Sequence, residues 1–273
     1  QYSKQILPYI MQNDVARTVF GKNFAQLWDD FRKDMLVRFA ADPEQTYVEG
    51  RSIADSGFRT QATTVLDDRL FVNYANDEDR AELRVYPTDS NAQAADGEFL
   101  TYTKGITDLD VNAEGVIAAS RRISYSSGRL ENDIFIWQNS DWTRLTSEQR
   151  LRKVRWLPEG ELLVASRMVA GISELYLLNL SGEMSLLWRG VAGDVLGDFD
   201  VSPDGLSIAA SIKRPDQGWN LELFSIADHV WTPLTNSLSI ESTPEYTPDG
   251  SLLFTADYDG VFNIYLRTSE GDV

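Results

Sequence analysis

The sequence predicts an all-β protein, a β-propeller of about five four-stranded blades, with a short helical segment before it. Three observations predict this fold: turn tetrads that recur about every 45 residues, an alternating strand before each turn, and a nearly continuous apolar strand after it. A single blade cannot cover both faces of its own sheet. The repeat therefore supplies the neighbouring sheets that do so.

Residues 1–41 do not repeat and predict a helical segment, which could be the remnant of an upstream domain. "VARTVFG" and "KNFAQLWDDFRKDMLVRF" read as two helices, with Gly21 ending the first. Asn23 is the expected N-cap of the second helix, and Gln26 completes a partial capping box. We expect an apolar stripe along one face of this helix, formed by Phe24, Leu27, Trp28, Phe31 and Leu36.

Residues 42–273 form the predicted propeller domain, organised by five aligned turn tetrads. Three of the tetrads contain proline, an acidic residue and glycine, which suit a tight turn because proline presets φ and glycine tolerates positive φ. The tetrads start 46, 45, 45 and 45 residues apart and are Leu66-Asp67-Asp68-Arg69, Asn112-Ala113-Glu114-Gly115, Leu157-Pro158-Glu159-Gly160, Ser202-Pro203-Asp204-Gly205 and Thr247-Pro248-Asp249-Gly250.

The residues around each tetrad predict the strands of a blade. Before each turn, apolar positions alternate with one intervening residue, as in a half-buried strand. These intervening residues are Thr64, Asp110, Arg155, Asp200 and Glu245. After each turn comes an apolar run such as "VIAA" or "LLVA", which predicts a strand covered on both faces. A third strand follows in every repeat, and a weaker fourth follows in the first four.

Two alternatives concern the overall architecture. A β-sandwich also has short strands and frequent turns, but it does not require a fixed 45-residue period. The fifth repeat ends at "RTSEGDV" after its third strand, so the propeller could be truncated there. Either "TYVEG", Thr46 to Gly50, supplies the missing strand and closes the ring, or more blades follow in a longer protein.

The last repeat, "STPEYTPDGSLLFTADYDGVFNIYL", resembles the repeat of TolB-like propellers, and "RLT" and "PLT" resemble its close. The resemblance covers residues 55–273 and fades towards the first repeat, whose tetrad lacks proline and glycine. It implies a propeller fold, a periplasmic or extracellular location and a binding role. TolB-like repeats also occur beside serine-peptidase domains of the prolyl oligopeptidase type.

The N-terminal phrase "FGKNFAQLWDDFRKDM" resembles the C-terminal helices of gluzincin-type metallopeptidase domains. Some bacterial proteins join such a domain to a TolB-like propeller. The His-Glu-x-x-His zinc motif of that family is absent from this chain, so no catalytic residue is carried over. Because the chain begins at Gln1, we expect either a removed leader or an internal piece of a longer protein.

Composition excludes several classes of function. The net charge of −17 opposes binding to nucleic acid or to anionic membrane surfaces. The absence of cysteine excludes disulfides and thiolate sites, and the single histidine, His229, excludes a multi-histidine zinc site. No apolar run is long enough to span a membrane. We expect no cofactor and no resident metal.

Few residues suggest chemistry. Asp257 and Asp259 in "DYDG" could belong to a calcium loop, but a simple Asp-Gly turn explains them with fewer assumptions. His229 lacks the Gly-x-Ser-x-Gly elbow of a catalytic triad and reads as a surface residue. The 42 acidic residues make chance carboxylate pairs common, and nothing selects two for glycoside cleavage.

The most plausible functional surface is the mouth of the central channel, where the first strands of the blades begin. The predicted binding residues there are Asp108, Arg152, Lys153, Asp198 and Glu241. Their mixed charge would suit a peptide or a loop of a partner protein, whereas the alternative is a solvated channel without a ligand. The sequence therefore predicts a non-catalytic binding module of a larger bacterial envelope protein, or the substrate-gating domain of a peptidase whose catalytic domain lies elsewhere.

Overall fold

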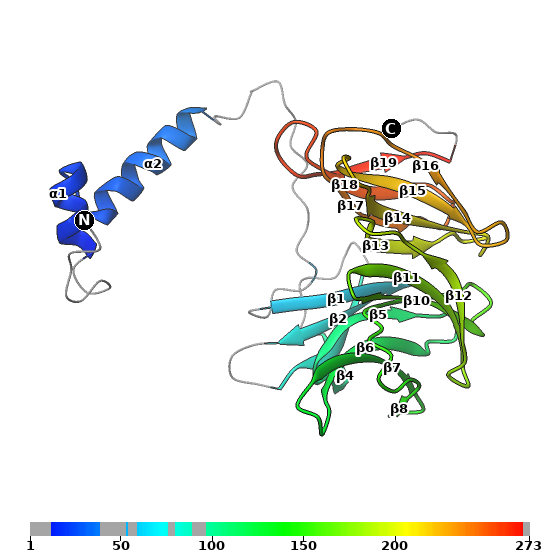
Figure 1. Cartoon of the computed structure of the whole chain (residues 1–273). Coiled ribbons are helices and arrows are strands. Elements are labelled where there is room, and N and C mark those ends of the chain that lie inside the picture. Colours follow the sequence, from blue (N-terminus) through cyan, green and yellow to red (C-terminus); the bar gives the residue numbers. More distant parts are fainter. Residues whose placement is uncertain (1–11, 39–52, 54–58, 76–79, 89–96, 270–273) are drawn as a thin grey trace. The chain divides into compact units, whose positions relative to one another are not determined.

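The computed structural model describes residues 12–38, 53, 59–75, 80–88 and 97–269 (Figure 1). The chain divides into two compact units, Gln1–Arg51 and Ser52–Val273. The boundary predicted between residues 41 and 42 lies outside the described residues. The predicted closing strand at residues 46–50 lies outside them too, so both remain predictions.

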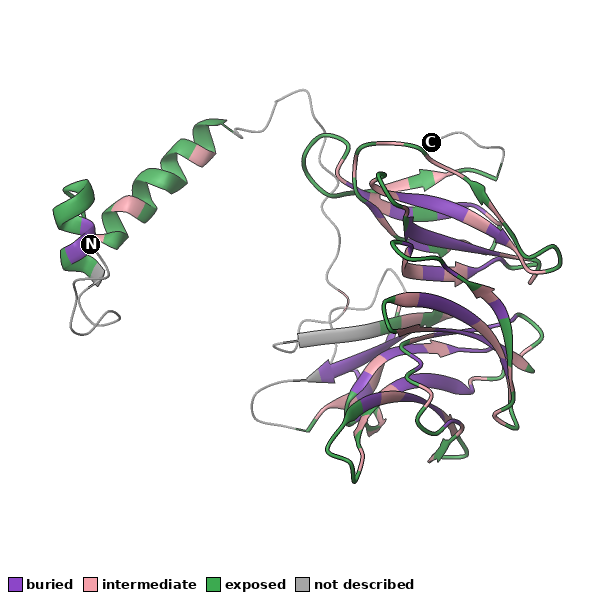
Figure 2. Cartoon of the chain, viewed as in Figure 1, coloured by how far each residue is buried: buried purple, intermediate pink, exposed green. Residues whose placement is uncertain are grey.

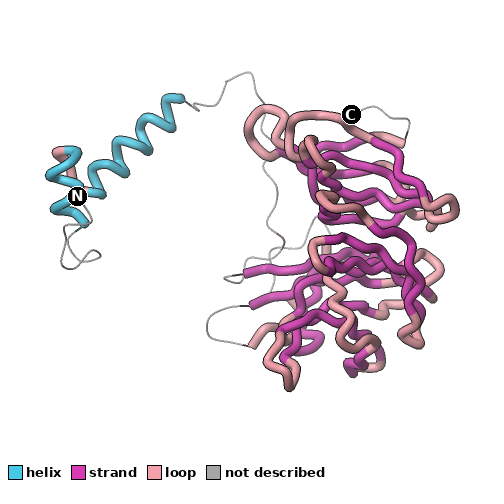
Figure 3. Tube along the Cα trace, viewed as in Figure 1, coloured by secondary structure: helices cyan, strands magenta, loops and turns pink. Residues whose placement is uncertain are grey.

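The first unit contains two helices, α1 (Gln12–Phe20) and α2 (Phe24–Arg38), shown in cyan in Figure 3. The capping box at the start of α2 is reciprocal. The backbone N–H of Gln26 donates to the side chain of Asn23 over 2.9 Å, and the N–H of Asn23 donates to the side chain of Gln26 over 3.0 Å. Gly21 follows α1 with φ of +71°. The two predicted helices, the capping box of the second and the glycine that ends the first are thus confirmed.

The apolar stripe of α2 is exposed rather than buried among the described residues. Trp28 is 65% exposed and Phe31 is 50% exposed, with their ring centroids 5.5 Å apart. No residue of α2 is buried. Burial of an amphipathic face usually supplies most of the stability of a short helix. The apolar face of α2 lacks such packing among the described residues.

The second unit is a propeller of five antiparallel sheets (Figures 1 and 3). Within the described residues, four blades have four strands and the fifth has three, as the repeats predicted. The blades are, in order, β1 (Arg59–Leu66), β2 (Arg69–Ala75), β3 (Glu82–Pro87) and β4 (Glu98–Tyr102); β5 (Ile106–Val111), β6 (Ile117–Ser124), β7 (Leu130–Gln138) and β8 (Asp141–Arg144); β9 (Lys153–Trp156), β10 (Leu162–Val169), β11 (Ile172–Asn179) and β12 (Met184–Arg189); β13 (Val195–Val201), β14 (Ser207–Lys213), β15 (Trp219–Ser225) and β16 (Val230–Pro233); and β17 (Glu241–Tyr246), β18 (Leu252–Ala256) and β19 (Asn263–Arg267).

The turn tetrads join the first and second strands of the blades. All four glycines that end a tetrad adopt positive φ, between +69° and +82°. Each donates its N–H to the carbonyl of the residue that opens the tetrad, as Gly205 does to Ser202 over 2.8 Å. The degenerate first tetrad has no glycine, and Asp67 adopts φ of +54° in its place. Glycine is therefore selected at these positions by backbone conformation.

The core lies between blades rather than inside one central cluster (Figure 2). Blades 3 and 4 meet at Val164, Leu175, Phe199 and Ile208, which are all fully or almost fully buried. Equivalent clusters join blades 1 and 2, blades 2 and 3, and blades 4 and 5. The second strands are covered on both faces, as their apolar runs predicted, except that β18 alternates between buried and exposed positions.

Candidate functional site

The first strands of the blades line a central channel. They contact one another in chain order, β1 with β5, β5 with β9, β9 with β13 and β13 with β17. The alternation before each turn tetrad sends one side chain per blade towards the axis. A cavity of about 410 Å³ lies there, and its lining includes the five intervening residues, Thr64, Asp110, Arg155, Asp200 and Glu245.

Side chains of one first strand bind the backbone of the next. The Asp110 carboxylate accepts the N–H of Trp156 over 2.7 Å, and the Asp200 carboxylate accepts the N–H of Tyr246 over 2.7 Å. Asp108 accepts the N–H of Val154 over 2.8 Å. Each pair is 46 residues apart, one repeat plus one residue. The aspartates therefore join neighbouring blades at the channel wall.

Arg155 occupies the equivalent position in the third blade and cannot accept such a bond. Its guanidinium instead lies 3.0 Å from a carboxylate oxygen of Asp108, 3.7 Å from one of Asp200 and 3.6 Å from one of Glu245. It also donates to the carbonyl of Val154 over 2.7 Å. A single cation thus neutralises part of an acidic channel wall drawn from blades 2, 4 and 5.

Burial and charge shift the pKa values of this group. Burial would lower the pKa of Arg155, but the carboxylates of Asp108, Glu245, Asp110 and Asp200 outweigh it and raise that pKa. Burial raises the pKa of Asp110 and Asp200 despite the nearby guanidinium. Burial, opposed by Arg155 and reinforced by the aspartates, raises the pKa of Glu245 to about 7.

A second cavity, of about 250 Å³, opens at the end of the channel where the first strands begin. We call it the mouth pocket, lined by Thr107, Arg122, Asn132, Arg152, Lys153, Ser166, Arg167, Met168, Ser173, Leu196, Gly197 and Asp198. Lys153 forms an ion pair with Asp198 and lies 3.7 Å from Asp108. Because Asp108 also contacts Arg155, one chain of charges connects the mouth pocket to the cavity around Arg155.

Irregular strand pairing marks the same end of the channel. The register of β5 with β6 shifts between Ile106 and Asp108, and that of β13 with β14 shifts between Leu196 and Phe199. Equivalent shifts occur in β1 and β17. In β17 the shift includes Thr243 with φ of +49°, an unusual conformation for a β-branched residue. Such bulges redirect side chains at the rims of β-structures.

The structure brings four of the five predicted site residues together. Arg152, Lys153 and Asp198 line the mouth pocket, and Asp108 contacts Lys153 from the channel wall. Glu241 lies apart from them. Its fully buried carboxylate accepts hydrogen bonds from Ser237 over 2.8 Å and from the Tyr258 hydroxyl over 2.7 Å, which tie the fifth blade's own loops together.

Sequence reasoning did not select Arg122, Ser166 or Arg155. Arg155 stands in the aligned set of intervening residues, and a lone cation among acidic equivalents was a signal that could have identified it. Arg122 lies near the end of β6, beside the start of β5, because the two strands are antiparallel. No sequence spacing signals that proximity without the register.

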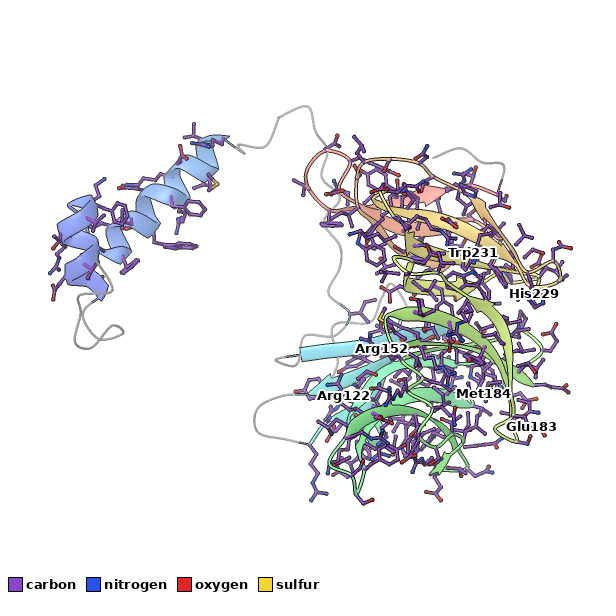
Figure 4. All side chains as sticks on the ribbon, in the orientation of Figure 1. Arg122, Arg152, Glu183, Met184, His229 and Trp231 are labelled. Atoms are coloured by element: carbon purple, nitrogen blue, oxygen red, sulfur yellow. The ribbon has the colours of Figure 1, made fainter. Side chains whose placement is uncertain are left out.

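The other residues considered for chemistry have structural roles. His229 lies in the turn before β16, where a ring nitrogen lies 2.7 Å from the carbonyl oxygen of Leu187. Figure 4 shows it and Glu183 on the opposite side of the propeller from Arg122 and Arg152. Asp257 opens a turn in which Gly260 donates back to its carbonyl over 2.8 Å. Among the described residues, no cluster of three histidine or acidic side chains is arranged to hold a metal ion.

No helix in the described part of the chain is both long and apolar enough to cross a membrane.

No protein-family model matches the chain. Solved structures do resemble it. A putative TolB from Agrobacterium tumefaciens superposes with a TM-score of 0.63 at 15% identity, over 79% of this chain and 79% of that one.

Two further structures extend the comparison. TolB from Acinetobacter baumannii gives a TM-score of 0.57 at 16% identity, over 77% of this chain and 55% of that chain. A prolyl endopeptidase gives 0.55 at 13% identity, over 96% of this chain but 39% of its own. The chain therefore spans about half of the second TolB and well under half of the peptidase. These likenesses confirm the TolB-like propeller fold.

Proposed function

We propose that this chain is a non-catalytic propeller module that binds a protein or peptide at the mouth of its central channel. It would belong to a larger bacterial envelope protein that lies in the periplasm or outside the cell. The observation that carries the proposal is the mouth pocket, a polar cavity of about 250 Å³ at the channel end with irregular strands. The TolB likeness supports the setting.

The arrangement of charges supports the same role. Inside the channel, Arg155 contacts three carboxylates, so that part of the wall is internally neutralised. At the mouth, the exposed side chains of Arg122 and Arg152 make no hydrogen bond or ion pair with any described residue. A rigid ring holds these groups in place before a partner arrives, which reduces the entropy lost on binding.

Site-directed photo-crosslinking tests this proposal. The photoreactive residue p-benzoylphenylalanine is placed at position 152 in the mouth, or at position 183 on the opposite side (Figure 4). Each protein is then irradiated with an envelope extract. We expect adducts from position 152 and few or none from position 183. Equal adducts from both positions, or more from position 183, would contradict the channel mouth as the contact surface.

A second candidate is a substrate-gating domain of a peptidase whose catalytic domain lies outside this chain. The observation that favours it is the likeness to the prolyl endopeptidase, in which the match covers 39% of that protein's chain. A puromycin hydrolase gives a further match, with a TM-score of 0.55 at 12% identity. The coding sequence on either side decides the setting, because a zinc motif upstream or a hydrolase domain downstream would support the peptidase.

A further inference from the structure

We propose that the mouth pocket recognises a carboxylate of a bound peptide, held by Arg122 and Arg152. The inference rests on the proposed peptide-binding function and names the chemical group that the site takes. That group is either the side chain of a glutamate or aspartate, or the C-terminal carboxylate of the peptide. The two sources share one chemistry, and the experiment below separates them.

The first step is the charge of the pocket lining. It contains four cations, Arg122, Arg152, Lys153 and Arg167, and one anion, Asp198. This concentration of positive charge stands out in a chain with a net charge of −17. An excess of cations in one cavity of an acidic protein favours an anionic ligand at that point.

Two of the four cations are already neutralised. Lys153 pairs with Asp198 and lies near Asp108. Arg167 donates to the Glu174 carboxylate over 2.7 Å. Their contribution to an incoming anion is therefore reduced by a carboxylate that each one already contacts.

The other two cations are unpaired. Arg122 lies near the end of β6 and Arg152 directly precedes β9, so neighbouring blades supply one each. Both are exposed, and neither side chain contacts a carboxylate or another acceptor among the described residues. Their backbones are fixed, because the N–H of Arg122 donates to Gly105 over 2.7 Å and that of Arg152 donates to Ser166 over 2.8 Å.

A serine hydroxyl in the pocket wall adds a second observation. Ser166 lines the pocket, and its hydroxyl makes no hydrogen bond with a described residue, so it is available to a ligand. It stands in the same cavity as the two free guanidinium groups, so a carboxylate held by them would find a further donor.

The surrounding charge favours a carboxylate over a phosphate. Guanidinium groups bind carboxylates in a two-pronged geometry with charge-assisted hydrogen bonds. Asp198 remains in the lining and Asp108 lies close behind it, so each extra negative charge on a ligand is opposed. These carboxylates repel both negative charges of a dianionic phosphate, whereas a carboxylate ligand carries only one.

Peptide binding tests the assignment. Four probes are titrated into the purified full chain at low salt, with binding followed by calorimetry. They are an acetylated and amidated Ala-Glu-Ala peptide, the same peptide with glutamine in place of glutamate, an acetylated Ala-Ala-Ala peptide with a free C-terminus, and inorganic phosphate. We expect at least one carboxylate peptide to bind about tenfold more tightly than the glutamine peptide, and which one binds identifies the source.

Variants tie the binding to the pocket. Arg122→Gln with Arg152→Gln should weaken that carboxylate peptide by about tenfold or more, because charged hydrogen bonds are lost. The matched control is Arg32→Gln with Lys33→Gln, which removes the same charge from exposed positions of α2. Circular dichroism confirms that each variant is folded. Replacing both arginines by lysine keeps the charge and should give intermediate affinity.

The outcomes separate this inference from the broader proposal. Failure of both carboxylate peptides to bind more tightly than the glutamine peptide, binding of phosphate alone, or unchanged affinity in the double variant would each overturn the carboxylate assignment. Crosslinking at position 152 would still support a channel-mouth partner in those cases. Conversely, carboxylate binding without any crosslinked partner would leave the pocket chemistry intact and count against the protein-binding role.

Discussion

Replacing Arg155 with methionine should strongly destabilise the propeller. Methionine keeps much of the aliphatic volume but removes a cation that contacts all three of Asp108, Asp200 and Glu245. Arg155 is 11% exposed at its side chain, and the carboxylate of Asp108 is 6% exposed. The substitution therefore leaves the largely buried carboxylates of Asp108 and Asp200 without this cation.

The distances set the size of the effect. Contacts of 3.0 to 3.7 Å correspond to about 4–6 kcal/mol per pair at an effective dielectric constant near 20, before the cost of desolvation. Desolvation offsets most of that attraction. Removing one partner of a buried pair typically costs about 3–5 kcal/mol in the free energy of unfolding. We expect a loss in that range at pH 7.

The loss should depend on pH with a definite sign. Without Arg155, the pKa values of Asp110 and Asp200 rise further above their ordinary values, so the folded state binds more protons than the unfolded state. The stability of the variant then falls as pH rises through this interval. The deficit relative to the natural chain should be smaller at pH 5 than at pH 8.

Urea unfolding followed by tryptophan fluorescence measures these free energies. Arg155→Lys, which keeps a cation, is the control and should lose less stability than Arg155→Met. Adding Asp108→Asn to the methionine variant should recover part of the loss. A deficit below about 1 kcal/mol, or an equal deficit at pH 5 and pH 8, would refute the ion-pair account.

Two further predictions concern the channel and the turns. Glu245→Gln should raise the unfolding midpoint at pH 8 more than at pH 5, because a carboxyl with its pKa raised to about 7 reduces stability as pH rises from about 4.5 towards 7. The gain should stay below about 1 kcal/mol, since this side chain is 57% exposed, and an equal effect at both pH values would count against it. Gly205→Ala should cost more than Gly250→Ala in thermal unfolding, although both glycines have positive φ worth about 1–2 kcal/mol. A Cβ at Gly205 would lie 3.2 Å from Pro158, whereas one at Gly250 meets nothing within 4 Å, so equal losses would contradict the packing argument.

The repeat made the fold readable from the sequence. Proline, an acidic residue and glycine mark three of the five turns because they suit the backbone conformation, and Gly160 adopts φ of +74° as expected. Alternation before the turn correctly placed Asp110 and Arg155 on the same side of their strands as Asp200. These features are local or periodic, so one sequence is enough to detect them.

The partners of the charged side chains could not be predicted from the sequence in the same way. Lys153 and Arg152 are adjacent in the chain, yet one is paired with Asp198 and the other is free. Glu241 has the charge of a site residue, but three hydroxyl groups bind its carboxylate in the interior. Bulges near the starts of the first strands decide which side chains contact one another. The spacing of residues in the sequence does not predict where these bulges lie.

Arginine side-chain NMR tests the central claim most directly, namely that the channel pairs its inner charges and leaves two arginines free at its mouth. The Nε–Hε signals of a ¹⁵N-labelled chain are followed during titration with the carboxylate peptide that binds most tightly. We predict saturable shifts for Arg122 and Arg152, while Arg155 stays unmoved because its partners already hold it. Shifts at Arg155 without shifts at the two mouth arginines, or uniform shifts at all arginines, would contradict the account.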